Sequence, residues 1–292
     1  MILITGVTGH LGKAVLESLL NKISPTDIAV LVRNKSKVAE LKSKGIIVQM
    51  GDYDDYTSLV NAFIGIDKLY FVSGSDLHKR LSQHENVVNA AKKAEVKQVI
   101  YTSLQLKNET NMSPIALLAK AHFTTEKLLR ESGLDYSILR HGCYAEMIPR
   151  LIGEKGFETG KIFLPAGNGR SSFVTRKDLA EAGAVILTTP GHDNRIYELT
   201  GVESIDFTEV AKILSSIAGR RFEYLSPEPK AFTRTLRNAG VPDETIQYLL
   251  GFGKAISEGE FDHLTRDLEK LLGKKPTTVR QFLKIFYNQN CL

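Results

Sequence analysis

The sequence predicts an α/β fold built on a doubly wound parallel sheet, with a smaller and mainly helical C-terminal lobe. Short apolar runs rich in β-branched residues alternate with amphipathic segments through the first two thirds of the chain. Each run is apolar on both faces, as in a parallel sheet covered by helices on either side. Because strand and helix alternate from the first residues, we expect right-handed crossovers between parallel strands.

Six strands are expected in the first segment of the chain. They cover residues 2–5, 28–32, 46–49, 68–72, 98–102 and 136–139.

Helices are expected between these strands. After Gly9, apolar residues recur at intervals of three and four, which is the spacing of one helix face. A second helix is expected around residues 81–91. A third begins near Pro114, since proline suits the first turn of a helix, and ends near Gly133, since glycine suits the C-terminal cap.

The pattern is less regular after residue 139. Glycine is frequent in residues 153–173, which we expect to form loops with one short strand at 161–164. Helices are expected at 178–188, 207–218, 231–239 and 279–287, and a strand at 195–200. We predict a first domain over residues 1–152, to which the strand near 195–200 returns. A second lobe over residues 153–292 is expected to cover the carboxyl edge of the sheet.

The composition is that of an ordinary soluble globular protein. Lys and Arg total 38 against 33 Asp and Glu, a net charge of +5 that is spread along the chain. Such an excess weakly favours an acidic ligand and argues against nucleic acid. No apolar run approaches the ~18 residues of a membrane span, and the first residues do not resemble a signal peptide. Two cysteines are typical of a reducing cytoplasm, and the seven histidines show no metal-ligand spacing.

A glycine-rich turn, residues 6–12, connects the first expected strand to the first helix. Glycines here permit the tight turn, close approach of the backbone to a pyrophosphate, and close helix–strand packing. The N-terminus of the helix offers free N–H groups and a positive dipole end to phosphates. We therefore expect a dinucleotide, and a Rossmann-type domain, with this turn as its binding site; the alternative is a turn without a ligand. The candidate residues are Gly6, Thr8, Gly9, His10, Leu11 and Gly12.

The end of the second strand indicates which dinucleotide binds. An NAD site usually has an acidic residue there to bind the ribose 2′-hydroxyl. This chain has Arg33 instead, with Lys35 and Lys37 close behind. A guanidinium binds a 2′-phosphate through two parallel hydrogen bonds. The sequence thus favours NADPH (NADP) over NADH; the alternative is a solvated basic loop.

Further candidates follow the other strands, because ligands of open α/β sheets bind beyond the carboxyl ends of the strands. Asp52 follows the third strand, where it would meet the adenine. Each of these positions is equally compatible with a turn selected for its backbone. The other candidate cofactor contacts are Ser73, Gly74, Ser75, Thr102, Ser103 and His141.

The sequence as a whole resembles the NmrA-like group of atypical short-chain dehydrogenase/reductases. Within that group it is most similar to type 2 NAD(P)H:quinone oxidoreductases and triphenylmethane dye reductases. The resemblance implies hydride transfer from a reduced nicotinamide to a conjugated acceptor. It rests on residues 6–12, Arg33, Gly51-Asp52-Tyr53, residues 124–127, 136–140, 174–180, 195–201 and 239–243.

One departure from better-known short-chain dehydrogenases affects the chemistry. Those enzymes carry a Tyr-x-x-x-Lys pair on the helix after the fifth strand, for proton transfer. Here Leu118 and His122 occupy the two positions. His122 is either a packed core residue or a catalytic residue that orients the nicotinamide ribose or donates a proton. Tyr144 is a second candidate in the active site, where it would line an aromatic slot with Phe157, Phe163 and Phe173; core packing is the alternative.

We therefore expect a cytoplasmic, NADPH-dependent oxidoreductase that transfers hydride to a quinone or similar conjugated acceptor. The alternative is a regulator of the same NmrA-like group that binds NADP(H) without turnover and senses redox state. No metal and no nucleic acid partner are expected.

Overall fold

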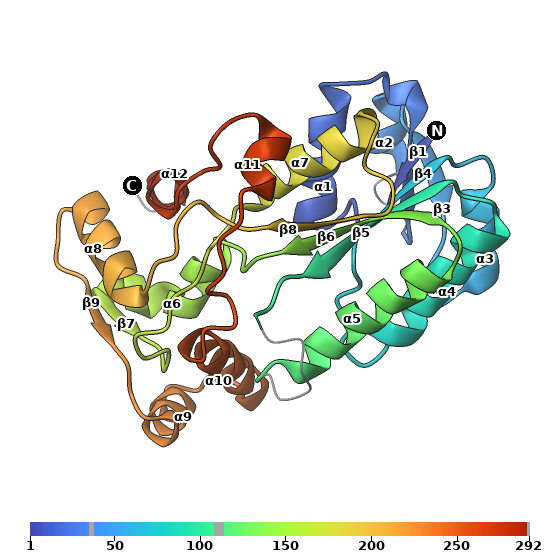
Figure 1. The fold of residues 1–292 in the computed structure, drawn as a ribbon. Coiled ribbons are helices and arrows are strands. Elements are labelled where there is room, and N and C mark those ends of the chain that lie inside the picture. Colours follow the sequence, from blue (N-terminus) through green and yellow to red (C-terminus); the bar gives the residue numbers. More distant parts are fainter. Residues whose placement is uncertain (35–37, 108–113, 291–292) are drawn as a thin grey trace.

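The computed structural model describes residues 1–34, 38–107 and 114–290. Within these residues, one parallel sheet runs through the centre of the molecule (Figure 1). Its strands are β1 (Ile2–Ile4), β2 (Ile28–Val32), β3 (Ile47–Met50), β4 (Lys68–Phe71), β5 (Gln98–Leu104), β6 (Asp135–His141) and β8 (Arg195–Leu199). Their order across the sheet is β3-β2-β1-β4-β5-β6-β8. The predicted Rossmann-type fold class is confirmed, since this order runs outward in both directions from β1 and β4.

Helices cover both faces of the sheet (Figure 1). Helices α3, α4 and α5 pack in a row on one face, and α1 packs against α7 on the other. The apolar face predicted for the first helix is confirmed, because Leu11, Val15, Leu16 and Leu19 are buried. These elements are α1 (His10–Leu20), a 3-10 helix η1 (Pro25–Asp27), α2 (Val38–Ser43), α3 (Tyr56–Phe63), α4 (Arg80–Lys93), α5 (Ala116–Glu131) and α7 (Arg176–Thr188).

Most of the remaining elements contribute to a separate apolar core. A two-stranded parallel sheet pairs β7 with β9, and helices surround it (Figure 1). The elements are α6 (Met147–Thr159), β7 (Lys161–Phe163), α8 (Phe207–Ala218), β9 (Glu223–Leu225), α9 (Pro229–Asn238), α10 (Asp243–Ser257), α11 (Asp267–Leu272) and α12 (Val279–Asn290). Helix α11 packs on α7 and β8, so part of the C-terminal segment also covers the main sheet. The domain boundary at residue 152 stays a prediction.

The expectation of loops at the start of residues 153–173 is wrong. Helix α6 continues to Thr159, across a kink at Gly153 where φ is 73°. Gly156 is buried and packs against β7, where a Cβ would lie 3.1 Å from the carbonyl oxygen of Lys161. The glycines therefore provide a kink and a close contact within a helix rather than ending it.

The carboxyl ends of β1, β4, β5 and β6 lie next to one another. The register pairs Ile4 with Tyr70, and Phe71 with Tyr101. It pairs Leu104 with His141. Since the order of the strands reverses between β1 and β4, this edge is where a doubly wound sheet binds its ligand.

Candidate active site at the carboxyl edge of the sheet

The glycine turn, residues 6–12, packs closely against the segments on either side of it. Gly6 adopts a φ of +65°, and a Cβ on it would lie 3.0 Å from Cβ of Val72 on the neighbouring segment. Gly12 packs α1 onto β1, because a Cβ there would lie 2.4 Å from the carbonyl oxygen of Gly6. Gly9 is exposed, and its N–H donates to that same carbonyl oxygen. The fold therefore requires glycine at positions 6 and 12, whereas Gly9 lies at the surface.

The N-terminus of α1 is open to an anion. Helix α1 begins at His10, has no side-chain cap and carries no acidic residue in its first turn. Its first N–H groups have no acceptor within the helix and lie at the positive end of the helix dipole. Thr8 and His10 are exposed, whereas Leu11 is buried, so only the backbone of Leu11 is available to a ligand.

Arg33 and Asp52 lie at the neighbouring ends of β2 and β3. Arg33 is exposed and forms no ion pair with the residues that the structure describes. Lys35 and Lys37 fall outside the described residues. Oδ1 of Asp52 accepts the N–H of Asp54 at 3.1 Å, so part of the Asp52 carboxylate holds its own turn. The Tyr53 hydroxyl lies within hydrogen-bond distance of Thr5 Oγ1 and of the carbonyl oxygen of Val72. Tyr53 therefore ties this turn to the ends of β1 and β4.

The turn after β4 is held by side chains of the neighbouring elements. The N–H of Ser73 donates to Oγ1 of Thr102 at 2.9 Å, and the N–H of Gly74 donates to Nε2 of His84 at 2.9 Å. Ser75 is exposed. The Thr102 hydroxyl and the Gly74 N–H are thus already engaged within the protein, which leaves the Ser73 and Ser75 side chains available to a ligand.

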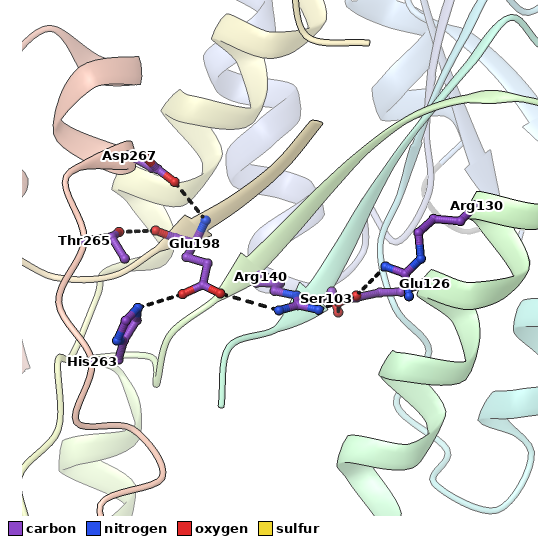
Figure 2. Close-up of polar contacts among 8 residues, drawn as sticks. All are labelled: Ser103, Glu126, Arg130, Arg140, Glu198, His263, Thr265 and Asp267. Atoms are coloured by element: carbon purple, nitrogen blue, oxygen red, sulfur yellow. Dashed lines mark hydrogen bonds and ion pairs between the residues drawn. The ribbon is translucent and has the colours of Figure 1, made fainter. Parts of the chain in front are cut away.

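Ser103 belongs to a buried charge network (Figure 2). Its hydroxyl donates to Glu126 at 2.6 Å, and Glu126 also accepts from Arg140 at 2.7 Å. Arg140 contacts Glu198 at 3.4 Å, and Glu198 accepts from His263 at 2.8 Å. The fully buried Glu126 is therefore compensated by charge-assisted hydrogen bonds. The network joins α5, β5, β6 and β8, and it occupies the Ser103 hydroxyl.

His122 lies between Tyr101 and Arg80. Its Nδ1 is 2.8 Å from the Tyr101 hydroxyl, and its Nε2 is 3.5 Å from a terminal nitrogen of Arg80. Burial and the nearby Arg80 charge lower the pKa of His122 well below its usual value. The ring is therefore neutral at neutral pH. Leu118, one turn earlier on α5, offers no proton.

His141 and Tyr144 meet at the end of β6. Nδ1 of His141 lies 3.1 Å from the Tyr144 hydroxyl, and the guanidinium of Arg176 lies 4.2 Å from the centre of the Tyr144 ring. Burial lowers the pKa of His141 to about 3 and raises that of Tyr144 to about 12. Both side chains are therefore neutral. Nε2 of His141 is buried and has no hydrogen-bond partner among the residues that the structure describes.

Each of the other aromatic candidates forms a ring contact with a residue other than Tyr144. Phe157 stacks on Tyr287 at 4.0 Å, and Phe163 stacks on Phe232 at 5.6 Å. Phe173 is buried against Phe207. These contacts support the expectation that the three rings pack in the apolar core, rather than the expectation that they line one slot with Tyr144.

Sequence reasoning missed two residues of this region. His84 on α4 accepts the Gly74 N–H and lies 2.8 Å from Thr125, and Arg80 reaches His122 from the same helix. Both residues could have been found in the sequence, because each is a polar residue on the otherwise apolar face of α4.

The described residues contain no candidate for a metal centre or for a membrane-spanning helix. No group of three or more His, Cys, Asp or Glu could hold a metal ion. No helix is long and apolar enough to cross a membrane. A cleft of about 510 Å³ beyond β8 is lined by Thr200, Glu203, Arg266 and Lys275, among others, and by none of the predicted site residues.

A sequence profile of the NmrA-like family matches residues 1–283. The chain belongs to the NmrA-like family. It is 36% identical to quinone oxidoreductase 2 of Escherichia coli over 290 residues, which cover 99% of this chain and 100% of that protein. It is 28% identical over 291 residues to an NAD(P)H azoreductase of Xenophilus azovorans, with 97% of each chain covered. The resemblance seen in the sequence is thereby confirmed.

Two solved structures share this fold closely. The triphenylmethane reductase of Citrobacter, complexed with NADP(H), superposes with a TM-score of 0.90 at 35% identity, covering 98% of this chain and 99% of that one. The NADPH-dependent quinone oxidoreductase of Escherichia coli, complexed with NADPH, has a TM-score of 0.90 at 35% identity, covering 99% of this chain and 100% of that one.

Proposed function

We propose that this protein is an NADPH-dependent oxidoreductase that reduces quinones or similar conjugated acceptors. The observation that carries the proposal is the open glycine turn followed by the exposed Arg33, which forms no ion pair with any described residue, in a chain 36% identical along its whole length to a quinone oxidoreductase. Relatives described as quinone oxidoreductase, azoreductase and triphenylmethane reductase act on acceptors with extended conjugation.

The residues of the turn fit NADPH. The pyrophosphate would lie against Gly9, whose missing side chain leaves the space open, and would accept from the first N–H groups of α1. Arg33 would hold the 2′-phosphate and Asp52 would lie near the adenine. NADPH, when bound, supplies a hydride to the acceptor.

The nicotinamide half would lie over the ends of β4, β5 and β6. In this proposal Ser73 and Ser75 contact its ribose, while His122 and Tyr144 border the acceptor. Because His122 is neutral and Leu118 replaces the usual tyrosine, no strong proton donor stands at this position. The protein then contributes mainly orientation, which suffices for an acceptor that spreads the incoming charge over a conjugated system.

The direct test is steady-state oxidation of NADPH in the presence of quinones, cationic dyes, enones and simple ketones. We expect many turnovers with conjugated acceptors and little activity with unconjugated aldehydes and ketones. Equal turnover of simple ketones and quinones would refute the argument about proton donation. Binding of NADPH without turnover of any acceptor would identify the chain as a redox-sensing regulator instead.

The proposed location is the cytoplasm. Cys143 is a buried free thiol, and burial raises its pKa to about 12, so it is not a reactive thiolate. Labelling with a thiol reagent before and after unfolding of the purified native protein would show whether both cysteines are reduced, as the proposal requires.

A further inference from the structure

Arg80 is a buried cation without a counter-charge among the described residues. It is the first residue of α4, and only 7% of its surface is exposed. Its Nε is buried and has no hydrogen-bond partner, and its contact with His122 is long at 3.5 Å. By contrast, the guanidinium of Arg140 is satisfied by Glu126 and Glu198.

The position of Arg80 is unfavourable for folding. A cation at the N-terminus of a helix lies at the positive end of the helix dipole, and burial removes its hydration. The side chains around it, Tyr101, Tyr144 and His122, are all neutral. The carboxylate of Asp76 interacts electrostatically with Arg80, but it is exposed and accepts the N–H groups of its own turn. An apolar side chain would therefore be more stable here, which indicates that the charge is retained for a ligand.

Arg80 lies on the acceptor side of the site. Its side chain reaches His122 on α5 and lies within electrostatic range of Tyr101 on β5 and Tyr144 beyond β6. These elements surround the carboxyl ends of β5 and β6, away from the adenosine side at Arg33. The free donors of Arg80 thus belong to the part of the site where the reducible group would bind.

We propose that Arg80 binds the oxygen of the acceptor that becomes negative on reduction, and that it selects neutral or anionic quinones over cationic dyes. The inference rests on the proposed function and names its substrate class. A quinone that accepts a hydride becomes a hydroquinone monoanion, and one proton from solvent completes the hydroquinone. A cationic triarylmethyl dye that accepts a hydride becomes neutral, so it gains nothing from a nearby cation and is repelled by it while it binds.

The test compares Arg80→Gln, Arg80→Lys and Arg80→Met with the wild type. We expect Arg80→Gln to lower kcat/KM for a neutral quinone and for a sulfonated naphthoquinone by ~10- to 100-fold, since a charge-assisted hydrogen bond is lost. For a cationic triarylmethyl dye, kcat/KM should stay unchanged or rise. Arg80→Lys should retain part of the quinone activity. The control variant is Arg234→Gln, because Arg234 is an exposed arginine on α9. It removes the same charge away from the proposed contact and should change kcat/KM neither for the quinones nor for the dye.

Two further readouts do not depend on turnover. In the NADP⁺ complex, a hydroxynaphthoquinone that is anionic at neutral pH should bind ~10-fold more weakly to Arg80→Gln than to wild type. Arg80→Met should melt at a higher temperature than wild type, because an uncompensated buried charge is removed.

Three outcomes would overturn the inference. They are an equal loss of activity with quinones and dyes in a folded Arg80→Gln, unchanged quinone activity, and a lower melting temperature of Arg80→Met. Failure of the wild type to reduce any quinone would instead refute the proposed function, whereas the binding and melting measurements would still decide the role of Arg80.

Discussion

Gly9 and Gly12 are separated by one helical turn, yet the structure assigns them different roles. Gly9 has φ −93° and ψ 171°, a backbone conformation open to any residue, and a Cβ there would meet only the carbonyl oxygen of Gly6 at 3.3 Å. A Cβ on Gly12 would lie 2.4 Å from that oxygen and 2.5 Å from its carbon. We therefore expect Gly9→Val to fold and lose the cofactor, and Gly12→Ala to lose stability.

The magnitudes follow from these distances. At Gly12 the 2.4 Å contact is with backbone, which cannot rotate away, so α1 must move from β1 by about 1 Å to restore ordinary contact. Overpacking of this kind costs ~1–3 kcal/mol or more. At Gly9 the added side chain projects into the space proposed for the pyrophosphate. Loss of one charge-assisted hydrogen bond there costs ~1.5–3 kcal/mol, which weakens NADPH binding by about tenfold to more than a hundredfold.

The assay combines thermal melting of the apoprotein with titration of NADPH. Gly9→Val should melt within a few degrees of the wild type and bind NADPH at least tenfold more weakly. Gly12→Ala should melt well below both. Wild-type affinity in a folded Gly9→Val would refute the reasoning, because it would place the pyrophosphate elsewhere.

Three other perturbations test the site. Arg33→Ala should weaken NADPH by ~10- to 100-fold and leave NADH unchanged, as measured by titration of both cofactors, and equal wild-type affinities for NADPH and NADH would contradict the role of Arg33. His122→Ala should lower quinone turnover by ~10- to 100-fold if the ring assists the reaction, and an unaltered rate would make it a packing residue. His84 and His141 have pKa values of about 3 in the fold against 6.5 in the unfolded chain, so the unfolded state takes up protons first as the pH falls. The free energy of unfolding should therefore be highest above pH 6.5 and should decline toward pH 3, by up to ~1.4 kcal/mol per pH unit for each histidine. In His141→Gln, the melting temperature should depend less on pH in that range.

The fold class and the glycine turn could be predicted from the sequence because both depend on local patterns. Apolar runs and helical spacing are patterns of neighbouring residues, and the glycine turn lies within residues 6–12. Gly6 is required there by its positive φ, and Gly12 by its close contact with the backbone of Gly6. Glycine gave a misleading signal only in α6, where Gly153 and Gly156 produce a kink and a close contact instead of a loop.

The partners of the site residues were decided by the tertiary structure. The hydroxyl of Ser103, a predicted cofactor contact, donates to Glu126, which lies 23 residues further along the chain. Arg80 meets His122 across 42 residues, and Arg140 meets Glu198 across 58. Such contacts follow from strand order and from the packing of α4 against α5, and no local pattern encodes them. The sequence by itself therefore predicts where a dinucleotide would bind, because that prediction needs only a local pattern of glycines. The folded chain was needed to show that the buried guanidinium of Arg80 has no counter-charge among the described residues.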